Sequence, residues 1–528
     1  MRLKNYLAIC IFVLSIPFFL AACAEKQQGD NKEESNEEVE LDTELNVAME
    51  SQPVSLDPLM SPSGSTVVTT RNIYEALVTL DTNYEPVLML ADSVEVEDDG
   101  KRYIFKLREG VTFHNGEEMT AEDVVASMNR WLGNSSRAKT LLTDATFEEV
   151  EPYTVALELP EIASDVLYIL AGQGQFPAIM PKEIVEAADT TGVTEYIGTG
   201  PFMFEEYKTD SYLHLKKYED YKMLDKPSNG ISGKKEVFIE DLYFHFVPDS
   251  NTRQTGLQTG LYDIVNALPV EDFEKIKQNE DINLLITLDG KIDLYYNKAE
   301  GPFADKKVRQ AVNAAIDAEE VLMGLYPSEE LYRVDNGYMH KENEDWYTDA
   351  GKGAYNQKDI EKAKALLQES SYDGEEITIL ASHDYPWSGD TAIILQQQLQ
   401  EIGMNVTPEF FDWPTVNERF NDPANFDIYI GGTGFVEVPS QLLPINPSFA
   451  GWTNDEKIDE LKNKIRQEMD KEKAKQIWEE LQAYLWEDYL PVTTIGHRMK
   501  VAAVNNNVEG VETFDHPIYW NVKVIKQD

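Results

Sequence analysis

The sequence has little cysteine, and its basic residues are far fewer than its acidic ones. Its two cysteines, Cys10 and Cys23, lie in the first 23 of 528 residues. The rest of the chain therefore has neither a disulfide framework nor a thiolate metal site. The 95 acidic residues outnumber 46 basic ones and give a formal charge of −49. This balance argues against nucleic acid and anionic lipid surfaces as partners, because both would be repelled. It fits either a solvated acidic surface or a salty or alkaline habitat.

Motifs for catalysis and cofactor binding are also missing. GGTG at 431–434 lacks the Gly-Lys-Ser/Thr of a phosphate loop, and GQGQF at 172–176 and GTGPF at 198–202 miss the dinucleotide fingerprint. No Gly-x-Ser-x-Gly or His-Glu-x-x-His motif occurs. The seven histidines lie far apart, and we interpret each as a surface or internally satisfied residue. We predict no enzyme activity, no catalytic residue, no metal site and no cofactor.

The first 22 residues are predicted to be a signal peptide. Arg2 and Lys4 precede an apolar run at 7–20, a pattern typical of export, and a proline in this run disfavours the alternative of a retained single-span anchor. The run ends in LAAC at 20–23, which resembles the bacterial lipobox. That resemblance implies that Cys23 is lipidated, for example with palmitate, and becomes the mature N-terminus.

An acidic stretch at 23–44 follows, and it contains no aromatic residue. Such a segment cannot offset the entropy of ordering by burial, so we predict a flexible tether. Beyond it, 42% hydrophobic and 10% aromatic residues in the whole chain are enough for two or three ordered domains.

The two halves of the remaining chain differ in pattern. The first half predicts a mixed α/β body with antiparallel ribbons, and Thr120 with Asp123 forms a capping-box pattern before a helix. In the second half, strands at 377–382, 405–411 and 426–432 alternate with helices, which is typical of a parallel, doubly wound sheet. Asn356 is predicted to cap the helix that starts at 357.

The glycines at 431–434 come at the carboxyl end of one of these strands. Ligands collect at such ends in open α/β sheets, so the stretch can form a wall of a binding site. The alternative is a tight turn in which glycine supplies a positive φ and no ligand is needed.

Several longer segments carry a resemblance to a known family. They are ADSVEVEDDGKRYIFKLREGVTFHNGEEMTAEDVVASMNR at 91–130, GTGPFMFEEYKTDSYLHLKKYEDY at 198–221, YNKAEGPFADKKVRQAVNAAIDAEEV at 296–321, IEKAKALLQESSYDG at 360–374, and LQQQLQEIGMNV followed by Asp412–Trp413. In order and spacing they resemble the bacterial extracellular solute-binding proteins of family 5, which feed oligopeptide, dipeptide and nickel ABC importers.

The resemblance implies an α/β fold of two lobes that close like a clamshell, of the periplasmic-binding-protein type II and of its large subclass. Lobe 1 would combine residues 45–300 and 496–528, with an extra subdomain at about 81–195 inside it. Residues 301–495 would form lobe 2. Ligand binding would bring the lobes together, and this form would dock on a membrane permease.

The resemblance also implies where a ligand binds. A tryptophan that lines the site in peptide-binding relatives matches Trp413, and a loop whose backbone pairs with the peptide matches Gly431, Gly432, Thr433 and Gly434. An aspartate that holds the ligand's ammonium group there has no match, because Phe435 and Val438 occupy the aligned positions. Either Glu437 replaces it, or the ligand has no α-amine. A solvent-facing Glu437 with no role is a third reading.

Weaker candidates for the same site lie elsewhere in the chain. They are Ser63, Gly64 and Ser65; Gln173, Gln175 and Phe176; and Trp387.

The expected function is that of a lipid-anchored, monomeric receptor outside the membrane of a bacterium, of Gram-positive type by its anchor. It would bind a peptide or peptide-sized polar solute and deliver it to ABC permease subunits. A non-peptide ligand, such as chelated nickel, an oligosaccharide or a modified amine, is the main alternative. A cell-surface adhesin or chaperone is a further one.

Overall fold

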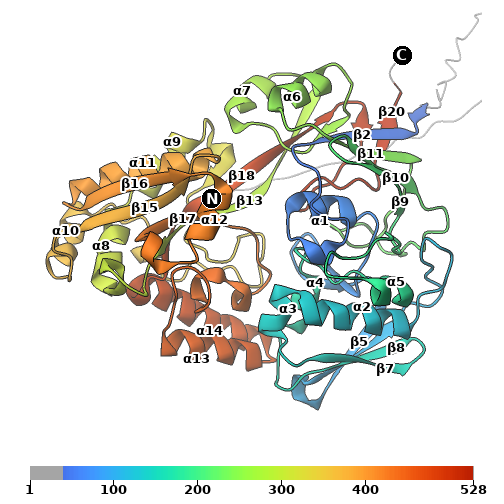
Figure 1. Ribbon diagram of the computed structural model, residues 1–528, viewed down its shortest axis with the longest axis horizontal. Coiled ribbons are helices and arrows are strands. Elements are labelled where there is room, and N and C mark those ends of the chain that lie inside the picture. Colours follow the sequence, from blue (N-terminus) through green and yellow to red (C-terminus); the bar gives the residue numbers. More distant parts are fainter. Residues whose placement is uncertain (1–39, 527–528) are drawn as a thin grey trace, which may run out of the picture. The chain divides into compact units, whose positions relative to one another are not determined.

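The computed structural model describes residues 40–526 (Figure 1). The chain divides into the units Met1–Glu40 and Leu41–Asp528. The predicted signal peptide at 1–22, Cys23 and most of the predicted tether at 23–44 lie outside the described residues. Among the described residues, no helix has both the length and the apolar character needed to cross a membrane.

One mixed sheet of eleven strands runs through the second unit. Its order is β16 (Asn405–Phe411), β15 (Glu376–Ser382), β17 (Ile428–Thr433), β13 (Ile282–Tyr296), β18 (Val492–Asn505), β12 (Ile264–Val265), β2 (Glu44–Met49), β11 (Asp241–Phe246), β10 (Tyr212–Lys217) and β9 (Phe202–Lys208), and β14 (Tyr332–Arg333) pairs with β18. We call the half built on β2 and β9–β12 the first lobe and the half built on β15–β17 the second lobe.

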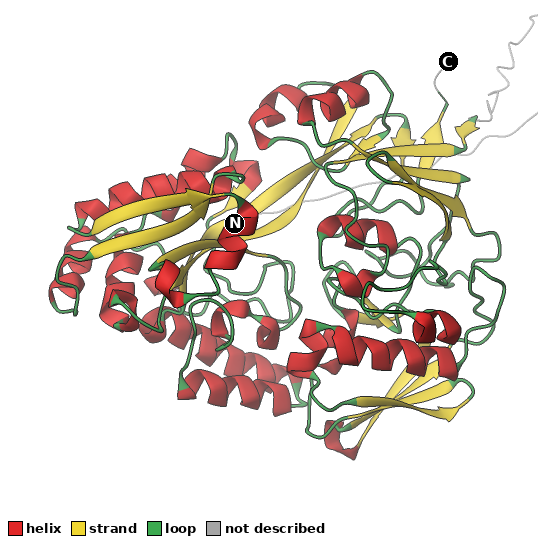
Figure 2. Cartoon of the chain, viewed as in Figure 1, coloured by secondary structure: helices red, strands yellow, loops and turns green. Residues whose placement is uncertain are grey.

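The long strands β13 and β18 belong to both lobes (Figure 2). They pair antiparallel from Ile282 opposite Asn505 to Tyr295 opposite Val492. The register shifts between Leu288 and Gly290, where the strand bulges. Because both strands are shared, the topology has no sharp break near 300 or 496, and these lobe boundaries stay predictions.

The first lobe carries three smaller sheets and its own helices. A four-stranded antiparallel sheet has the order β5 (Ala91–Glu97), β6 (Arg102–Leu107), β8 (Thr154–Glu158) and β7 (Thr146–Glu151). The helices of this lobe are α1 (Gly64–Thr70), α2 (Ala121–Asn134), α3 (Ser136–Leu141), α4 (Val166–Ala171), α5 (Lys182–Ala187), α6 (Ser250–Gln258) and α7 (Phe273–Ile276). The predicted capping box of α2 is present, with the Asp123 carboxylate accepting from the Thr120 N–H at 2.9 Å.

Order begins earlier than the sequence predicted. β1 (Leu41–Asp42) pairs with β20 (Lys523–Ile525), which also pairs with β19 (Val508–Glu509). A flexible tether that reaches residue 44 is therefore wrong, because Leu41 and Asp42 pair with the C-terminal strand and Glu44 begins β2. A last ribbon joins β3 (Val78–Leu80) to β4 (Pro86–Leu88).

In the second lobe the predicted parallel pattern holds for three strands. β15 is parallel to both β16 and β17, but β13 is antiparallel to β17, so the sheet is mixed. Alternating side chains build a core on each face: Ile379 packs with α8 (Lys306–Ala315), α9 (Ala318–Leu325), α10 (Ile360–Gln368) and α11 (Pro386–Glu401). Leu380 packs with α12 (Trp413–Arg419), α13 (Glu456–Gln467) and α14 (Lys471–Tyr484).

The predicted cap at Asn356 is wrong. The N-cap of α10 is Asp359, whose carboxylate accepts from the Lys362 N–H at 2.9 Å. Asn356 has a φ of 48° and instead accepts from the N–H of Ala318, at the start of α9. Both residue types suit a cap, so local sequence did not separate them.

A buried carboxylate ties the shared strands to the second lobe. Asp293 on β13 has no exposed surface and accepts from the hydroxyls of Thr433 on β17 and Thr494 on β18, each at 2.6 Å. The ammonium group of Lys291, on the same strand, is also buried. Burial lowers the pKa of Lys291, and the negative charge of Asp293 partly opposes this shift.

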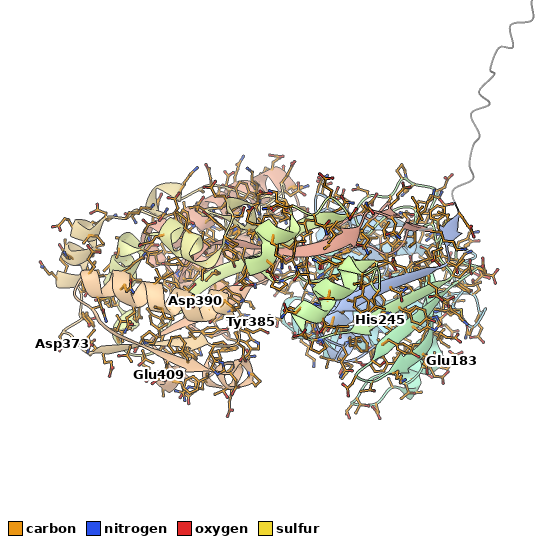
Figure 3. All side chains as sticks on the ribbon, turned by 90° about the horizontal axis from the view of Figure 1, so that it is seen from above. Glu183, His245, Asp373, Tyr385, Asp390 and Glu409 are labelled. Atoms are coloured by element: carbon orange, nitrogen blue, oxygen red, sulfur yellow. The ribbon has the colours of Figure 1, made fainter. Side chains whose placement is uncertain are left out.

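We predict that Asp293→Ala lowers the free energy of unfolding by about 3 kcal/mol, because it leaves Lys291 without this countercharge and two hydroxyls without their acceptor. Denaturant titration measures this. Asp390→Asn, at an exposed position on α11 (Figure 3), is the control and should leave the midpoint unchanged. Equal midpoints for both variants would contradict the role given to Asp293.

Candidate ligand-binding site

Three aromatic side chains gather at the carboxyl ends of the parallel strands of the second lobe. Trp387 lies in the first turn of α11, after β15, and Trp413 begins α12, after β16. Their ring centroids are 6.1 Å apart, and Tyr385 lies within 5.7 Å of both. The Asp384 carboxylate accepts from the Trp413 N–H at 2.7 Å and joins the two loops. We call Tyr385, Trp387 and Trp413 the aromatic wall, and Figure 3 places Tyr385 on the side that faces the first lobe.

The glycines of β17 adjoin this wall and do not form a tight turn. None of Gly431, Gly432 and Gly434 has a positive φ, so the turn alternative is wrong. A Cβ on Gly432 would lie 3.1 Å from Cη2 of Trp387, and one on Gly431 would lie 2.9 Å from a ring carbon of Tyr295. Absence of a side chain lets the rings approach the strand closely.

The backbone of β17 has one open edge. On one side the strand pairs with β13 from Ile428 to Thr433. On the other side, among the described residues, strand pairing is limited to Ile428 and Tyr429 with β15. Within 430–434, Gly432 and Gly434 are exposed and the other three residues are buried, so an extended ligand would reach the backbone at these two glycines first. The Thr433 side chain is buried against Asp293, so at this position only the backbone is available.

Phe435 and Glu437 contact the first lobe. Phe435 stacks on Tyr84 with centroids 3.8 Å apart, and on His340 at 5.1 Å. Glu437 is 5% exposed, and its carboxylate lies 3.7 Å from the guanidinium of Arg137 on α3. Burial raises the pKa of Glu437, and Arg137 lowers it. A solvent-facing Glu437 is therefore wrong, and its carboxylate already has a cationic partner.

A second group of contacts joins the lobes next to this pair. Asp165 accepts from the Ser440 hydroxyl at 2.6 Å and from Nε of Arg466 at 3.0 Å, and the Ser164 N–H donates to the Arg466 carbonyl at 2.8 Å. These residues bring α13 beside α3 and α4 (Figure 1). The lobes are thus linked in two ways: by the shared strands β13 and β18, and by these polar contacts between α13 and the region of α3 and α4.

The candidates in the first lobe fall in three places. Ser65, in the first turn of α1, is 8% exposed, and its hydroxyl donates to the Gln52 carbonyl at 3.2 Å. Ser63 is the N-cap of the same helix. A Cβ on Gly64 would lie 3.2 Å from Nε2 of His516. The amide of Gln175 is used within the lobe, by Leu59 and Ser136.

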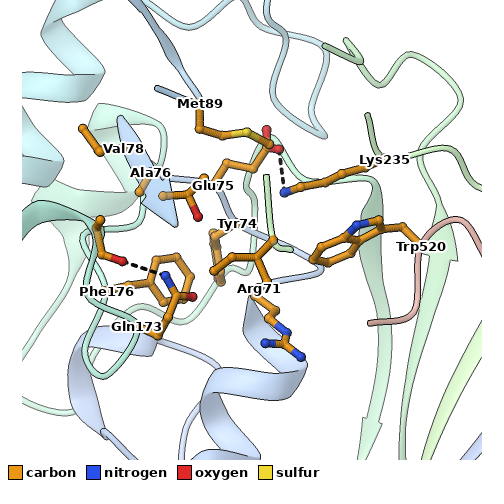
Figure 4. Close-up of a pocket in the computed structure, with 13 residues that line it drawn as sticks. Arg71, Tyr74, Glu75, Ala76, Val78, Met89, Gln173, Phe176, Lys235 and Trp520 are labelled. Atoms are coloured by element: carbon orange, nitrogen blue, oxygen red, sulfur yellow. Dashed lines mark hydrogen bonds and ion pairs between the residues drawn. The ribbon is translucent and has the colours of Figure 1, made fainter. Parts of the chain in front are cut away.

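Gln173 and Phe176 line a small internal cavity together with Arg71, Glu75, Lys235 and Trp520 (Figure 4). Its volume of about 30 Å³ suits one water molecule. Two of its lining residues, Glu75 and Lys235, form an ion pair at 3.0 Å. The cavity is too small to hold a peptide.

Sequence reasoning missed two cations on β18, of which Arg498 lies against the aromatic wall. The guanidinium of Arg498 lies 4.6 Å from the ring centroid of Trp387 and pairs with Asp289. Two residues further along β18, Lys500 donates to Nε2 of His516 at 3.0 Å. Nothing local marks these residues, since their partners come from distant parts of the chain. Among the described residues, no cluster of side chains suits a metal ion.

Comparison with known proteins gives consistent matches. Residues 85–443 match the model of the bacterial extracellular solute-binding proteins, family 5 middle. A probable peptide ABC transporter periplasmic-binding protein of Sinorhizobium fredii is 27% identical and covers 92% of this chain and 94% of its own. The oligopeptide-binding protein AppA of Bacillus subtilis is 24% identical and covers 99% and 98%.

A solved structure supports the same assignment of fold. The PBP AgaA of A. tumefaciens R10, in complex with agropinic acid, superposes with a TM-score of 0.75 at 25% identity, covering 92% of this chain and 99% of that one. The predicted fold class, a two-lobed α/β clamshell of the periplasmic-binding type, is confirmed.

We predict that Glu437→Gln lowers the free energy of unfolding by about 1–3 kcal/mol, because it leaves the Arg137 guanidinium buried without its carboxylate. Thermal or denaturant unfolding measures the change. The control is Glu460→Gln, which breaks an exposed pair with Lys464 and should have no measurable effect. A Glu437 variant as stable as this control would show that the pair does not hold the lobes together.

Proposed function

Because the chain belongs to the bacterial extracellular solute-binding proteins of family 5, we propose that it is the lipid-anchored receptor of an ABC importer and that its ligand is a peptide or a peptide-sized polar solute. The family consists of binding proteins, and the chain is a solute-binding protein rather than an enzyme. The ligand, the anchor and the site residues are the proposed parts.

The observation that carries the proposal is the open edge of β17 beside the aromatic wall. An extended ligand can pair with the backbone of residues 430–434 as an added strand. Trp387 and Trp413 then offer flat apolar surface to its side chains. Backbone pairing is insensitive to sequence, so such a site accepts varied peptides.

The named ligands of relatives support a site of this size without fixing the ligand. Two relatives are named as peptide-binding and oligopeptide-binding proteins, and AgaA holds agropinic acid. A second candidate, a ligand without a free α-amine, is favoured by Glu437. Its carboxylate is paired with Arg137, and Phe435 and Val438 offer no replacement. Chelated metal, an oligosaccharide or a modified amine fall within this class.

Lipidation of Cys23 would hold the protein on the outer face of the cell membrane as a monomer, next to the permease. The acidic segment after Cys23 would give the binding unit its reach. The LAAC sequence at the end of the apolar run supports this part of the proposal.

The site is tested with a preparation of residues 24–528 incubated with a casein digest and analysed by native mass spectrometry. We expect bound peptides, and we expect Trp413→Ala to weaken their binding by about fivefold to tenfold because a stacking surface is lost. Trp413→Phe, which keeps a ring, is the matched control and should bind more tightly than the alanine variant. Equal affinity of all three proteins would contradict the placement of the site.

The anchor is tested by labelling cells with radioactive palmitate. The unaltered chain should take up label and fractionate with membranes, whereas Cys23→Ser should lose the label. Label that persists in the Cys23→Ser variant would contradict lipidation at this position.

A further inference from the structure

The side chains of Arg498, Lys500 and His516 form a group that we call the basic cluster. Arg498 and Lys500 are two residues apart on β18, so they project from the same face of the strand. His516 comes from the C-terminal segment and receives a hydrogen bond from Lys500 at 3.0 Å.

The basic cluster adjoins the proposed site in both lobes. In the second lobe, a Cβ on Gly432 would lie 3.2 Å from Nη2 of Arg498, whose guanidinium also covers Trp387. In the first lobe, a Cβ on Gly64 would lie 3.2 Å from Nε2 of His516. The cluster therefore lies where the open edge of β17, the aromatic wall and the start of α1 come together.

Hydrogen-bond donors in the cluster are left over. Nε of Arg498 and Nδ1 of His516 are shielded from water and have no hydrogen-bond partner. Lys500 has three donor hydrogens, and its hydrogen bond goes to His516. The prediction that each histidine is satisfied or at the surface is thus wrong for Nδ1 of His516, and it is also wrong for His340, which is fully buried with no hydrogen-bond partner among the described residues on either ring nitrogen. Buried donors normally find acceptors, so these positions call for oxygen atoms that the chain does not supply.

Two of the carboxylates near the cluster are already engaged. Asp289 pairs with Arg498, and Asp515 accepts from Arg71 at 2.7 Å. Arg71 also donates to the carbonyls of His516 and Pro517 and so positions the histidine. Lys500 forms no ion pair with any carboxylate of the described residues, in a chain where acidic residues outnumber basic ones two to one.

Burial affects the protonation of both Lys500 and His516. It lowers the pKa of Lys500, an effect that Asp289, Asp515 and Glu50 oppose. Burial lowers the pKa of His516 to about 3, with a further lowering by Lys500, so the ring is neutral near pH 7. A neutral ring that accepts at Nε2 carries its hydrogen on Nδ1, which makes the unpartnered nitrogen a donor.

We propose that Arg498, Lys500 and His516 are an anion subsite, and that the ligand is a carboxylic acid whose carboxylate binds there. This inference rests on the proposed function and specifies its ligand. It joins two observations: near Phe435 no free carboxylate is available for an ammonium group, and near β18 buried donors lack an acceptor. The ligand would thus be held by its acidic end.

The test uses one mixture of small molecules in chemically altered forms. A casein digest is divided into an untreated part, a part esterified with acidic methanol to remove carboxylates, and a part acetylated to block amines. Residues 24–528 are incubated with each, and occupancy is read by native mass spectrometry. We expect occupancy from the untreated and acetylated parts, and a loss of at least about tenfold from the esterified part.

The outcomes separate the two proposals. Equal occupancy from the esterified and untreated parts would overturn the anion subsite and leave solute binding intact. Occupancy lost only on acetylation would also overturn it, because the amine would then be the anchor. No occupancy from the untreated part would count against both proposals.

A variant locates the effect at the cluster. Lys500→Met should weaken binding of the untreated ligands by about tenfold, because it removes a charge without leaving a paired carboxylate alone. Lys500→Arg should restore most of it, and Lys106→Met on β6 is the control at an exposed lysine. If Lys500→Met binds as tightly as the control, with both folded by circular dichroism, the subsite is elsewhere.

Discussion

The antiparallel pairing of β13 with β18 is the interaction on which the rest of the structure depends. Among the residues that the structure describes, it is the one sheet connection through which the first and second lobes share strands, and it carries Asp293, Arg498 and Lys500. Its backbone hydrogen bonds keep β17 beside the aromatic wall, because β17 pairs along β13. The bulge at Gly290 lies in the same stretch, where a Cβ would come within 2.6 Å of the Thr433 carbonyl. The strand pairing, the bulge and the proposed site are therefore in direct contact, and a change in one would disturb the others.

Polar contacts at the far side complete this arrangement. Arg137 with Glu437, and Asp165 with Arg466 and Ser440, join α3 and α4 to the second lobe. These are isolated polar contacts between side chains, and they can break and re-form more easily than the continuous pairing of two long strands. Ligand exchange fits this difference: one side of the site stays linked while the other can separate.

Much of the second lobe could be predicted from sequence because its signals are local. Alternating strands and helices fix where β15 and β16 end, and loops at those ends bring Trp387 and Trp413 together. Glu437 could not be interpreted correctly, since its partner Arg137 lies 300 residues away in sequence. The basic cluster was missed for the same reason: Arg498 meets Asp289 through strand pairing that no local pattern encodes. Asn356 and Asp359 show that the exact start of a helix is also hard to predict, because both residue types are good N-caps and only one of them caps α10.

The central claim is that a ligand binds along β17 against the aromatic wall, with its acidic end at β18. A crystal structure of residues 24–528, purified with a ligand retained, tests this most directly. We expect ligand density bounded by Trp387 and Trp413, paired with the backbone of residues 430–434, and ending in a carboxylate near Lys500. Ligand density that leaves these groups untouched, or an ammonium group at the basic cluster, would contradict the account.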